Sequence, residues 1–173
     1  MDYYYMIFAQ TIGIIAMGLD IYASLQKNDR RLIYISCAGS LVYAVHFFLL
    51  GAFAGALSEL FNGIRTGLSS VTKSHILAYT FIIIYGGLLL IVPHDLFGTF
   101  PFLSSISITI GMYFFSGVVM RVFIIAGFFL WLIYSIKVFS IGGIIAYSIL
   151  LITHTTTIFR LIGDDKKKNE TNL

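Results

Sequence analysis

The chain has 173 residues, of which 58% are hydrophobic and only 11% are charged, and its mean hydropathy is +0.93. An ordinary soluble domain carries about 25% charged residues, so this composition excludes a soluble globular protein and makes lipid the main solvent. One cysteine, Cys37, excludes an internal disulfide and offers no cysteine pair for a metal. The net charge of +3 comes from short basic clusters that no soluble domain presents. We interpret them as determinants of topology and expect no nucleic-acid partner.

Seven apolar runs follow one another along the chain, separated by charges, glycines and prolines. The runs are 4–26, 32–50, 52–71, 74–92, 97–116, 122–139 and 142–161. A helix that crosses a bilayer needs about 17 to 25 mostly apolar residues, and each run satisfies this length. Gly51 alone separates the second and third runs, which suits a tight helical hairpin. We therefore predict an all-α integral membrane protein with seven transmembrane helices.

The positions of the basic residues predict the orientation of these helices. The odd-numbered connections and the tail are basic, with Lys27, Arg30 and Arg31 in the first, Lys73 in the third, Arg121 bounding the fifth, and lysines at 166–168. The second and fourth connections contain no lysine or arginine. Because basic loops stay in the cytoplasm, we predict an N-terminus outside and a cytoplasmic C-terminus. Lys137 is the exception, and we expect its side chain to reach the outer interface.

The two halves of the chain resemble each other. Residues 30–51 align with residues 121–142 without a gap and share six of 22 positions, among them Tyr43/Tyr134 and Gly51/Gly142. We therefore predict two three-helix repeats, 1–72 and 96–163, with a linker helix at 73–95 and a basic cytoplasmic tail at 164–173. One linking helix gives both triplets the same orientation, as in the SWEET transporters. Substrate sites in such folds lie near the midplane between the repeats.

The end of the second predicted helix, the turn after it and the third predicted helix resemble a stretch of the YgjV family of bacterial inner-membrane proteins. The matching residues are His46, Phe47, Leu49, Leu50, Gly51, Gly55, Ala56, Asn62 and Arg65. The resemblance extends to the basic turn 29–31, whereas in the second half Thr153 and Thr156 stand where Asn62 and Arg65 stand in the first. It implies a multi-pass protein of the bacterial plasma membrane that is distantly similar to SWEET and PQ-loop transporters. The chain contains no Pro-Gln dipeptide, and the resemblance implies no substrate.

Three polar residues in the run 52–71 form the main candidate site. Glu59 lies eight residues after Gly51, or about 12 Å along a helix, which places it near the bilayer midplane. Asn62 follows at i+3 on the same face, and Arg65 follows Asn62 by three and can extend toward the cytoplasm. Ionisable groups at this depth are costly and usually functional, so we predict a substrate or proton site. A hydrogen-bonded network that only holds the bundle together is the alternative.

The second half offers three further candidates. The 91-residue shift pairs Asn62 with Thr153, and His154 follows directly, so we expect both to lie opposite Glu59. Trp131, in the sixth run, can stack on a planar or sugar-like ligand, although simple packing is the better account of it taken singly. We expect Asp20, in the first run, to reach the cytoplasmic interface near Lys27 rather than to join the site.

The leading functional prediction is transport of a small polar solute by alternating access, with substrate bound by Glu59, Asn62, Arg65, Thr153, His154 and Trp131. The alternative is a membrane protein that does not transport but binds or regulates a partner. No phosphate-binding glycine loop, zinc motif or nucleophile elbow occurs, so we expect no enzymatic activity, no cofactor and no metal. The expected partners are the lipid bilayer and a small polar solute, and a homo-oligomer is compatible with the sequence.

Overall fold

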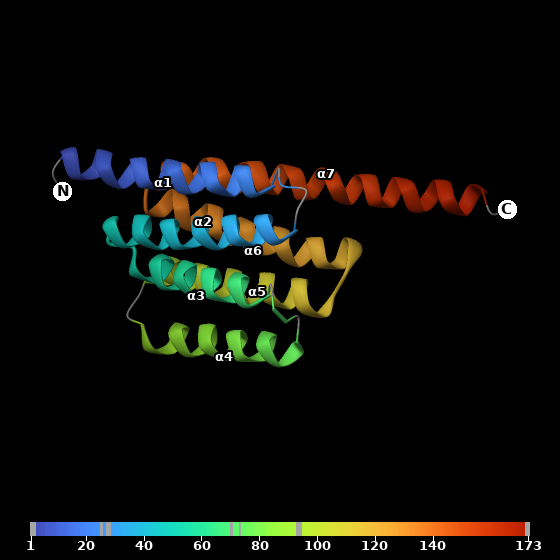
Figure 1. Ribbon diagram of the computed structural model, residues 1–173, viewed down its shortest axis with the longest axis horizontal. Coiled ribbons are helices and arrows are strands. Elements are labelled where there is room, and N and C mark those ends of the chain that lie inside the picture. The colour runs from blue at the N-terminus through green and yellow to red at the C-terminus, as the bar shows by residue number, and fades with distance from the viewer. Residues whose placement is uncertain are drawn as a thin grey trace.

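The computed structural model describes residues 3–24, 26, 29–69, 71–72, 74–92 and 95–171. All regular secondary structure in these ranges is helical (Figure 1). The elements are α1 (Tyr3–Ser24), α2 (Asp29–Leu49), α3 (Phe53–Ser69), α4 (His75–Ile91), the short 3-10 helix η1 (Leu96–Gly98), α5 (Thr99–Phe114), α6 (Gly117–Lys137) and α7 (Ile141–Thr171). The predicted all-α fold is confirmed, and each α-helix corresponds to one apolar run.

Two helix boundaries differ from the prediction by five residues or more. Helix α6 begins at Gly117 rather than at 122, so Arg121 lies within its first turns instead of in a connection. Gly117 itself has φ +60°, a conformation that glycine adopts without strain. Helix α7 continues to Thr171 rather than ending at 161. Residues 164–168 are all charged, which ends a membrane-crossing segment but does not end a helix.

Four helical segments in the described part of the chain are long and apolar enough to cross a membrane. They are Tyr3–Ala23, Leu96–Phe114, Gly117–Lys137 and Ile141–Gly163. The apolar helices Ile33–Leu49 and His75–Ile91 are shorter. Helix α3 has 17 residues and contains Glu59, Asn62 and Arg65, all buried inside the protein. A 17-residue helix is about 25 Å long, close to the thickness of the hydrocarbon core, so α3 has the length of a span but a polar inner face.

Six helices form a closed ring. Along the ring, α1 contacts α2, α2 contacts α3, α3 contacts α5, α5 contacts α6, α6 contacts α7, and α7 returns to α1. Helix α4 lies outside this ring against α5 and α3, at one edge of the molecule (Figure 1). Neighbours along the chain run antiparallel, because the turns between them are short. The ring therefore has two ends, and α1, α3, α5 and α7 all begin at the same one.

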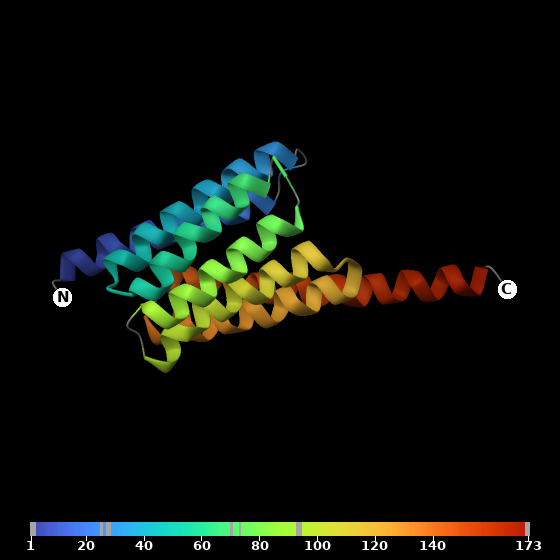
Figure 2. The ribbon, with the colours of Figure 1, turned by 90° about the horizontal axis from the view of Figure 1, so that it is seen from below.

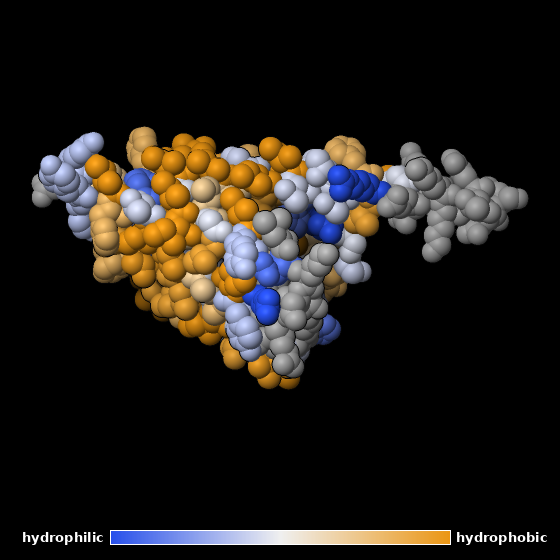
Figure 3. Space-filling model, turned by 45° about the horizontal axis from the view of Figure 1, so that its top comes forward, coloured by the Kyte–Doolittle hydropathy of each residue, from blue (hydrophilic) through white to orange (hydrophobic). Residues whose placement is uncertain are grey.

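The two ends differ in how closely the helices approach. We call the end where α1, α3, α5 and α7 begin the closed end, and the opposite end the mouth. Figure 2 shows that α1, α2 and α3 diverge from α5, α6 and α7 toward the mouth. On the face that Figure 3 shows, much of the surface is hydrophobic, and hydrophilic residues gather toward the mouth. A surface of this kind suits contact with lipid around the middle of the molecule.

Candidate functional site

A cavity of about 380 Å³ lies inside the ring of six helices, and we call it the central cavity. Every ring helix contributes to its lining, whereas α4 contributes no residue. The lining reaches the mouth, because it includes Ser69, the last residue of α3, and Tyr113, near the end of α5. Its volume falls in the range of about 300 to 1,000 Å³ that is usual for small-molecule sites.

Glu59 is the most enclosed acidic residue of the central cavity, with 5% of its surface exposed. The phenolic hydroxyl of Tyr147, on α7, donates a hydrogen bond of 3.1 Å to its carboxylate. Ser40 and Asn62 also lie close enough to interact with it. The predicted i,i+3 placement of Glu59 and Asn62 along one side of α3 is therefore observed, and both line the cavity. Tyr147, which reaches Glu59 from the far side of the ring, was not singled out from the sequence.

Asn62 and Arg65 connect the cavity wall to the neighbouring helices. The side-chain oxygen of Asn62 accepts a hydrogen bond of 2.7 Å from the hydroxyl of Tyr85, on α4. Arg65 is buried and does not extend to the interface. Its Nη1 donates to the backbone oxygen of Ser105 at 3.4 Å and to the hydroxyl of Thr109, both on α5. Arg65 turns sideways because α3 packs directly on α5, whose polar groups lie nearer than the membrane surface.

Asp20 also lines the central cavity, although the sequence suggested an interfacial position for it. The close approach of α1 to α2 explains its placement, because a methyl group added to Gly39 would lie 2.6 Å from Asp20 Oδ1. Asp20 and Glu59 interact electrostatically across the cavity. Lys27, its expected neighbour, lies outside the described residues. A carboxylate far inside an apolar run was the signal that pointed to Glu59, and the same signal applies to Asp20.

Aromatic side chains form the wall of the cavity toward the closed end. Trp131 is 1% exposed and stacks on Tyr147, with ring centroids 5.4 Å apart and an interplanar angle of 10°. It also stacks on Phe47 at 5.5 Å. Trp131 and Tyr147 line the cavity, whereas Tyr43 and Phe47 lie behind them in the same buried cluster. Trp131 therefore lies at the predicted site, where it both packs and faces the cavity.

Polar contacts between helices fasten the closed end. The ring nitrogens of His46, on α2, lie 2.7 Å from the backbone oxygen of Ala9 and 2.7 Å from the hydroxyl of Ser140. The amide nitrogen of Ile141 donates a hydrogen bond of 3.1 Å to the side chain of Gln10, on α1. Buried side chains and these contacts thus fill the interior of the ring between the aromatic wall and the closed end.

Two tyrosines that the 91-residue shift pairs, Tyr43 and Tyr134, each form a hydrogen bond at the closed end. The hydroxyl of Tyr43, on α2, donates to the backbone oxygen of Gly142, at the start of α7, with a distance of 3.4 Å. The hydroxyl of Tyr134, on α6, accepts from the backbone nitrogen of Gly55, near the start of α3, at 3.0 Å. Each tyrosine thus reaches the beginning of a helix in the opposite half of the chain.

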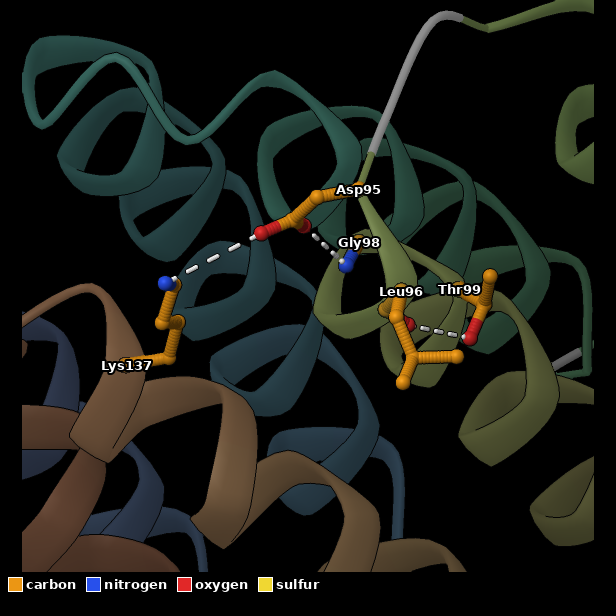
Figure 4. A network of polar contacts seen from close by, with 5 residues as sticks. All are labelled: Asp95, Leu96, Gly98, Thr99 and Lys137. Carbon is orange, nitrogen blue, oxygen red and sulfur yellow. Dashed lines mark hydrogen bonds and ion pairs between the residues drawn. The ribbon is translucent and has the colours of Figure 1, made fainter.

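Lys137 and Asp95 lie at the same end, nearer the surface (Figure 4). Their charged groups are 3.9 Å apart and largely exposed. Asp95 also accepts a hydrogen bond from the backbone nitrogen of Gly98, which caps η1. The Lys137 ammonium lies 5.0 Å from the centre of the Phe97 ring. This exposed pair fixes the connection before α5 and lies apart from the cavity lining.

The structure does not bring Thr153 and His154 opposite Glu59. Thr153 is exposed, and its hydroxyl donates to the backbone oxygen of Ile149 on its own helix. It borders a smaller cavity of about 150 Å³ that Asp20 also lines. His154 is half-buried, with Nδ1 3.4 Å from Nη1 of Arg121. A helix turns about 100° per residue, so His154 lies two turns from Tyr147 on nearly the same face, closer to the mouth, and Thr153 points elsewhere.

The described side chains include no group of three or more histidine, cysteine, aspartate or glutamate residues that could hold a metal ion. The central cavity instead offers two carboxylates, one guanidinium, amide and hydroxyl groups, and aromatic faces. Such a lining can bind a small solute through charge and hydrogen bonds.

Comparison with known proteins identifies the family. Residues 7–165 match the Imp-YgjV model, which describes a bacterial inner membrane protein. The chain is 30% identical over 152 residues to inner membrane protein YgjV of Escherichia coli (strain K12), a match that covers 88% of this chain and 83% of that protein. No solved structure matches the chain. The chain therefore belongs to the Imp-YgjV family, as its sequence resemblance predicted, and is a multi-pass helical protein of the bacterial inner membrane.

Proposed function

We propose that this protein transports a small polar solute across the inner membrane by alternating access. The observation that supports the proposal best is the central cavity, which has charged residues in its lining, extends to the mouth and is blocked toward the closed end. Ionisable groups inside a membrane protein are costly and typically mark a substrate or ion pathway. A cavity accessible from one side only is what one state of an alternating-access cycle requires.

We further propose that helices α1–α3 and α5–α7 are parallel repeats, with α4 as the linker. If the two triplets are exchanged, α1 takes the place of α5 and α7 takes the place of α3. The contact between α1 and α7 then corresponds to the contact between α5 and α3, and the structure has both contacts. The paired tyrosines also reach paired helices, since Tyr43 bonds the first turn of α7 and Tyr134 bonds the first turn of α3, which supports an axis along the membrane normal. In transporters with such symmetry, the repeats rock against each other around a site between them. Here the rocking would separate His46 from Ser140 at the closed end.

The expected orientation places the mouth in the cytoplasm. The connections at the mouth contain most of the loop lysines and arginines, so the positive-inside rule predicts that the closed end faces outside. A reporter fused after Leu173 should report a cytoplasmic position, and a reporter inserted at 93–95 should report a position outside. Paired phosphatase and fluorescent-protein fusions would measure this. An external signal from the C-terminal fusion would contradict the orientation and the count of spans.

Uptake or counterflow in proteoliposomes, with a broad panel of solutes, tests the function directly. For any solute that is transported, Glu59→Gln should reduce the uptake rate by about tenfold or more, because it removes a buried charge from the cavity. Asp95→Asn is the matched control, since it removes an exposed carboxylate outside the cavity and an asparagine oxygen can still cap η1.

Equal uptake in the two variants would leave Glu59 as a structural residue.

The alternative function, a protein that binds or regulates a partner without transport, is favoured by one observation: Glu59, Asn62 and Arg65 all have partners within the protein. Absence of uptake across the whole panel, from protein shown to be folded, would select that alternative.

A further inference from the structure

We infer that the central cavity binds a solute with a cationic ammonium group, held between the carboxylates of Asp20 and Glu59 and beside the aromatic side chains of Trp131 and Tyr147. This inference rests on the proposed transport function and specifies the class of substrate. The proposed function names only a small polar solute, whereas the described side chains of the cavity favour a solute of one sign of charge.

The charges of the cavity are unequal. Its lining contains two carboxylates, Asp20 and Glu59, and one cationic side chain, Arg65. The single ion pair among the described side chains joins Lys137 to Asp95, well away from the cavity. Neither cavity carboxylate therefore has a lysine or arginine nitrogen within 4.0 Å among those side chains. A carboxylate inside a membrane protein is costly unless it is paired, and a cationic solute would add to the electrostatic attraction that Glu59 receives from Arg65.

Arg65 is placed to support the cavity wall more than to attract an anion. Its Nη1 is engaged with the Ser105 backbone and the Thr109 hydroxyl, which anchors the guanidinium to α5. An anionic solute would have to lie in the same cavity as two carboxylates, which repel it. The net formal charge of these three side chains, −1, thus favours a cation.

The geometry around the carboxylates also suits an ammonium group. Tyr147 fixes one oxygen of Glu59 from α7, while Asp20 lies against Gly39 from α1, so the two acids approach the cavity from different helices. Trp131 and Tyr147 belong to the aromatic wall beside them. Both rings are stacked on other rings, Trp131 on Phe47 and Tyr147, so the carboxylates and not the ring faces supply the attraction for the cation. The volume of about 380 Å³ suits an organic cation and exceeds the needs of a bare metal ion.

Trp131 provides the means to test this inference, because it is the only tryptophan of the chain and lines the cavity. The full-length protein, in a maltoside detergent free of ammonium groups, is titrated with n-butylammonium and with choline. Their uncharged counterparts, 1-butanol and 3,3-dimethyl-1-butanol, have nearly the same shape. Trp131 fluorescence and the melting temperature are recorded, with sodium chloride at the same ionic strength as a blank.

We expect a saturable change with at least one ammonium compound at a concentration about tenfold or more below that of its uncharged counterpart. Asp20→Asn and Glu59→Gln should each weaken this binding by about tenfold, and Asp95→Asn should not. If one cavity variant fails to fold, the other and the comparison of paired compounds still decide. Equal responses to charged and uncharged compounds, or no saturable response to either ammonium compound, would overturn the inference.

The outcomes separate this inference from the proposed function. Selective ammonium binding without uptake of either compound would contradict transport of these cations and leave the binding site established. Uptake of a neutral or anionic solute, without ammonium binding, would confirm transport and refute the cationic substrate class.

Discussion

Replacing Gly142 with alanine should lower the melting temperature and loosen the closed end of the protein. Gly142 is the second residue of α7, and a methyl group there would overlap the backbone of Gly13 on α1. A backbone cannot rotate out of the way as a side chain can, so the two helices would have to separate. Overpacking of this kind costs about 1 to 3 kcal/mol in the free energy of unfolding. Thermal unfolding followed by Trp131 fluorescence measures the loss.

Gly18→Ala is the matched control, because it makes the same chemical change within α1. No atom lies within 4 Å of a methyl group at Gly18, and alanine favours helices more than glycine does. This control should therefore unfold at the wild-type temperature or slightly above it. A Gly142→Ala protein as stable as Gly18→Ala would show that α1 and α7 do not approach closely at this point.

Cross-linking the closed end should abolish uptake of any transported solute, which is the largest functional effect we expect. Gln10 on α1 and Ile141 on α7 are in contact through a hydrogen bond, and Ile141 is 50% exposed. Cysteines at these two positions, joined by a short bifunctional methanethiosulfonate, would hold α1 to α7. The native cysteine is replaced by Cys37→Ser, which keeps a donor for the backbone oxygen of Gly63. Because the outer side can then no longer open, uptake should fall by about tenfold or more and return after reduction.

Each single-cysteine protein, treated with the same reagent, serves as a control and should keep its uptake. Mass spectrometry of the intact protein would confirm the cross-link. A fully cross-linked protein that still transports would refute opening at the closed end, and with it alternating access as proposed here.

The sequence predicts the helices well because the physical cause is simple. Segments that cross lipid must be apolar and about 20 residues long, and charges, glycines and prolines interrupt them visibly. The placement of Glu59 and Asn62 on one side of α3 was also predictable, since it follows from helical spacing within one element. Such inferences need no knowledge of neighbouring helices.

The parts that the sequence did not reveal depend on contacts between helices. Asp20 joins the cavity because α1 lies closely against Gly39 of α2, and Arg65 turns toward α5 rather than the interface. Thr153 matches Asn62 in the alignment, yet it is exposed, because equivalent positions in two repeats need not face the cavity equally. The end of α7 was misplaced because hydropathy locates the bilayer, whereas charged residues can continue a helix outside it.

The length of α7 has a mechanical consequence. Its 31 residues extend about 46 Å, whereas the hydrocarbon core is about 30 Å thick, so its last turns project beyond the bilayer as a continuation of the same rod. Figure 1 shows this projection past the other helices. A rod pivoting near the membrane centre acts as a lever, and a tilt of about 10° moves its tip sideways by about 5 Å. Tilting of the wall that holds Tyr147 would thus become a displacement of Thr171 in the aqueous phase, where another molecule can sense the state of the cavity.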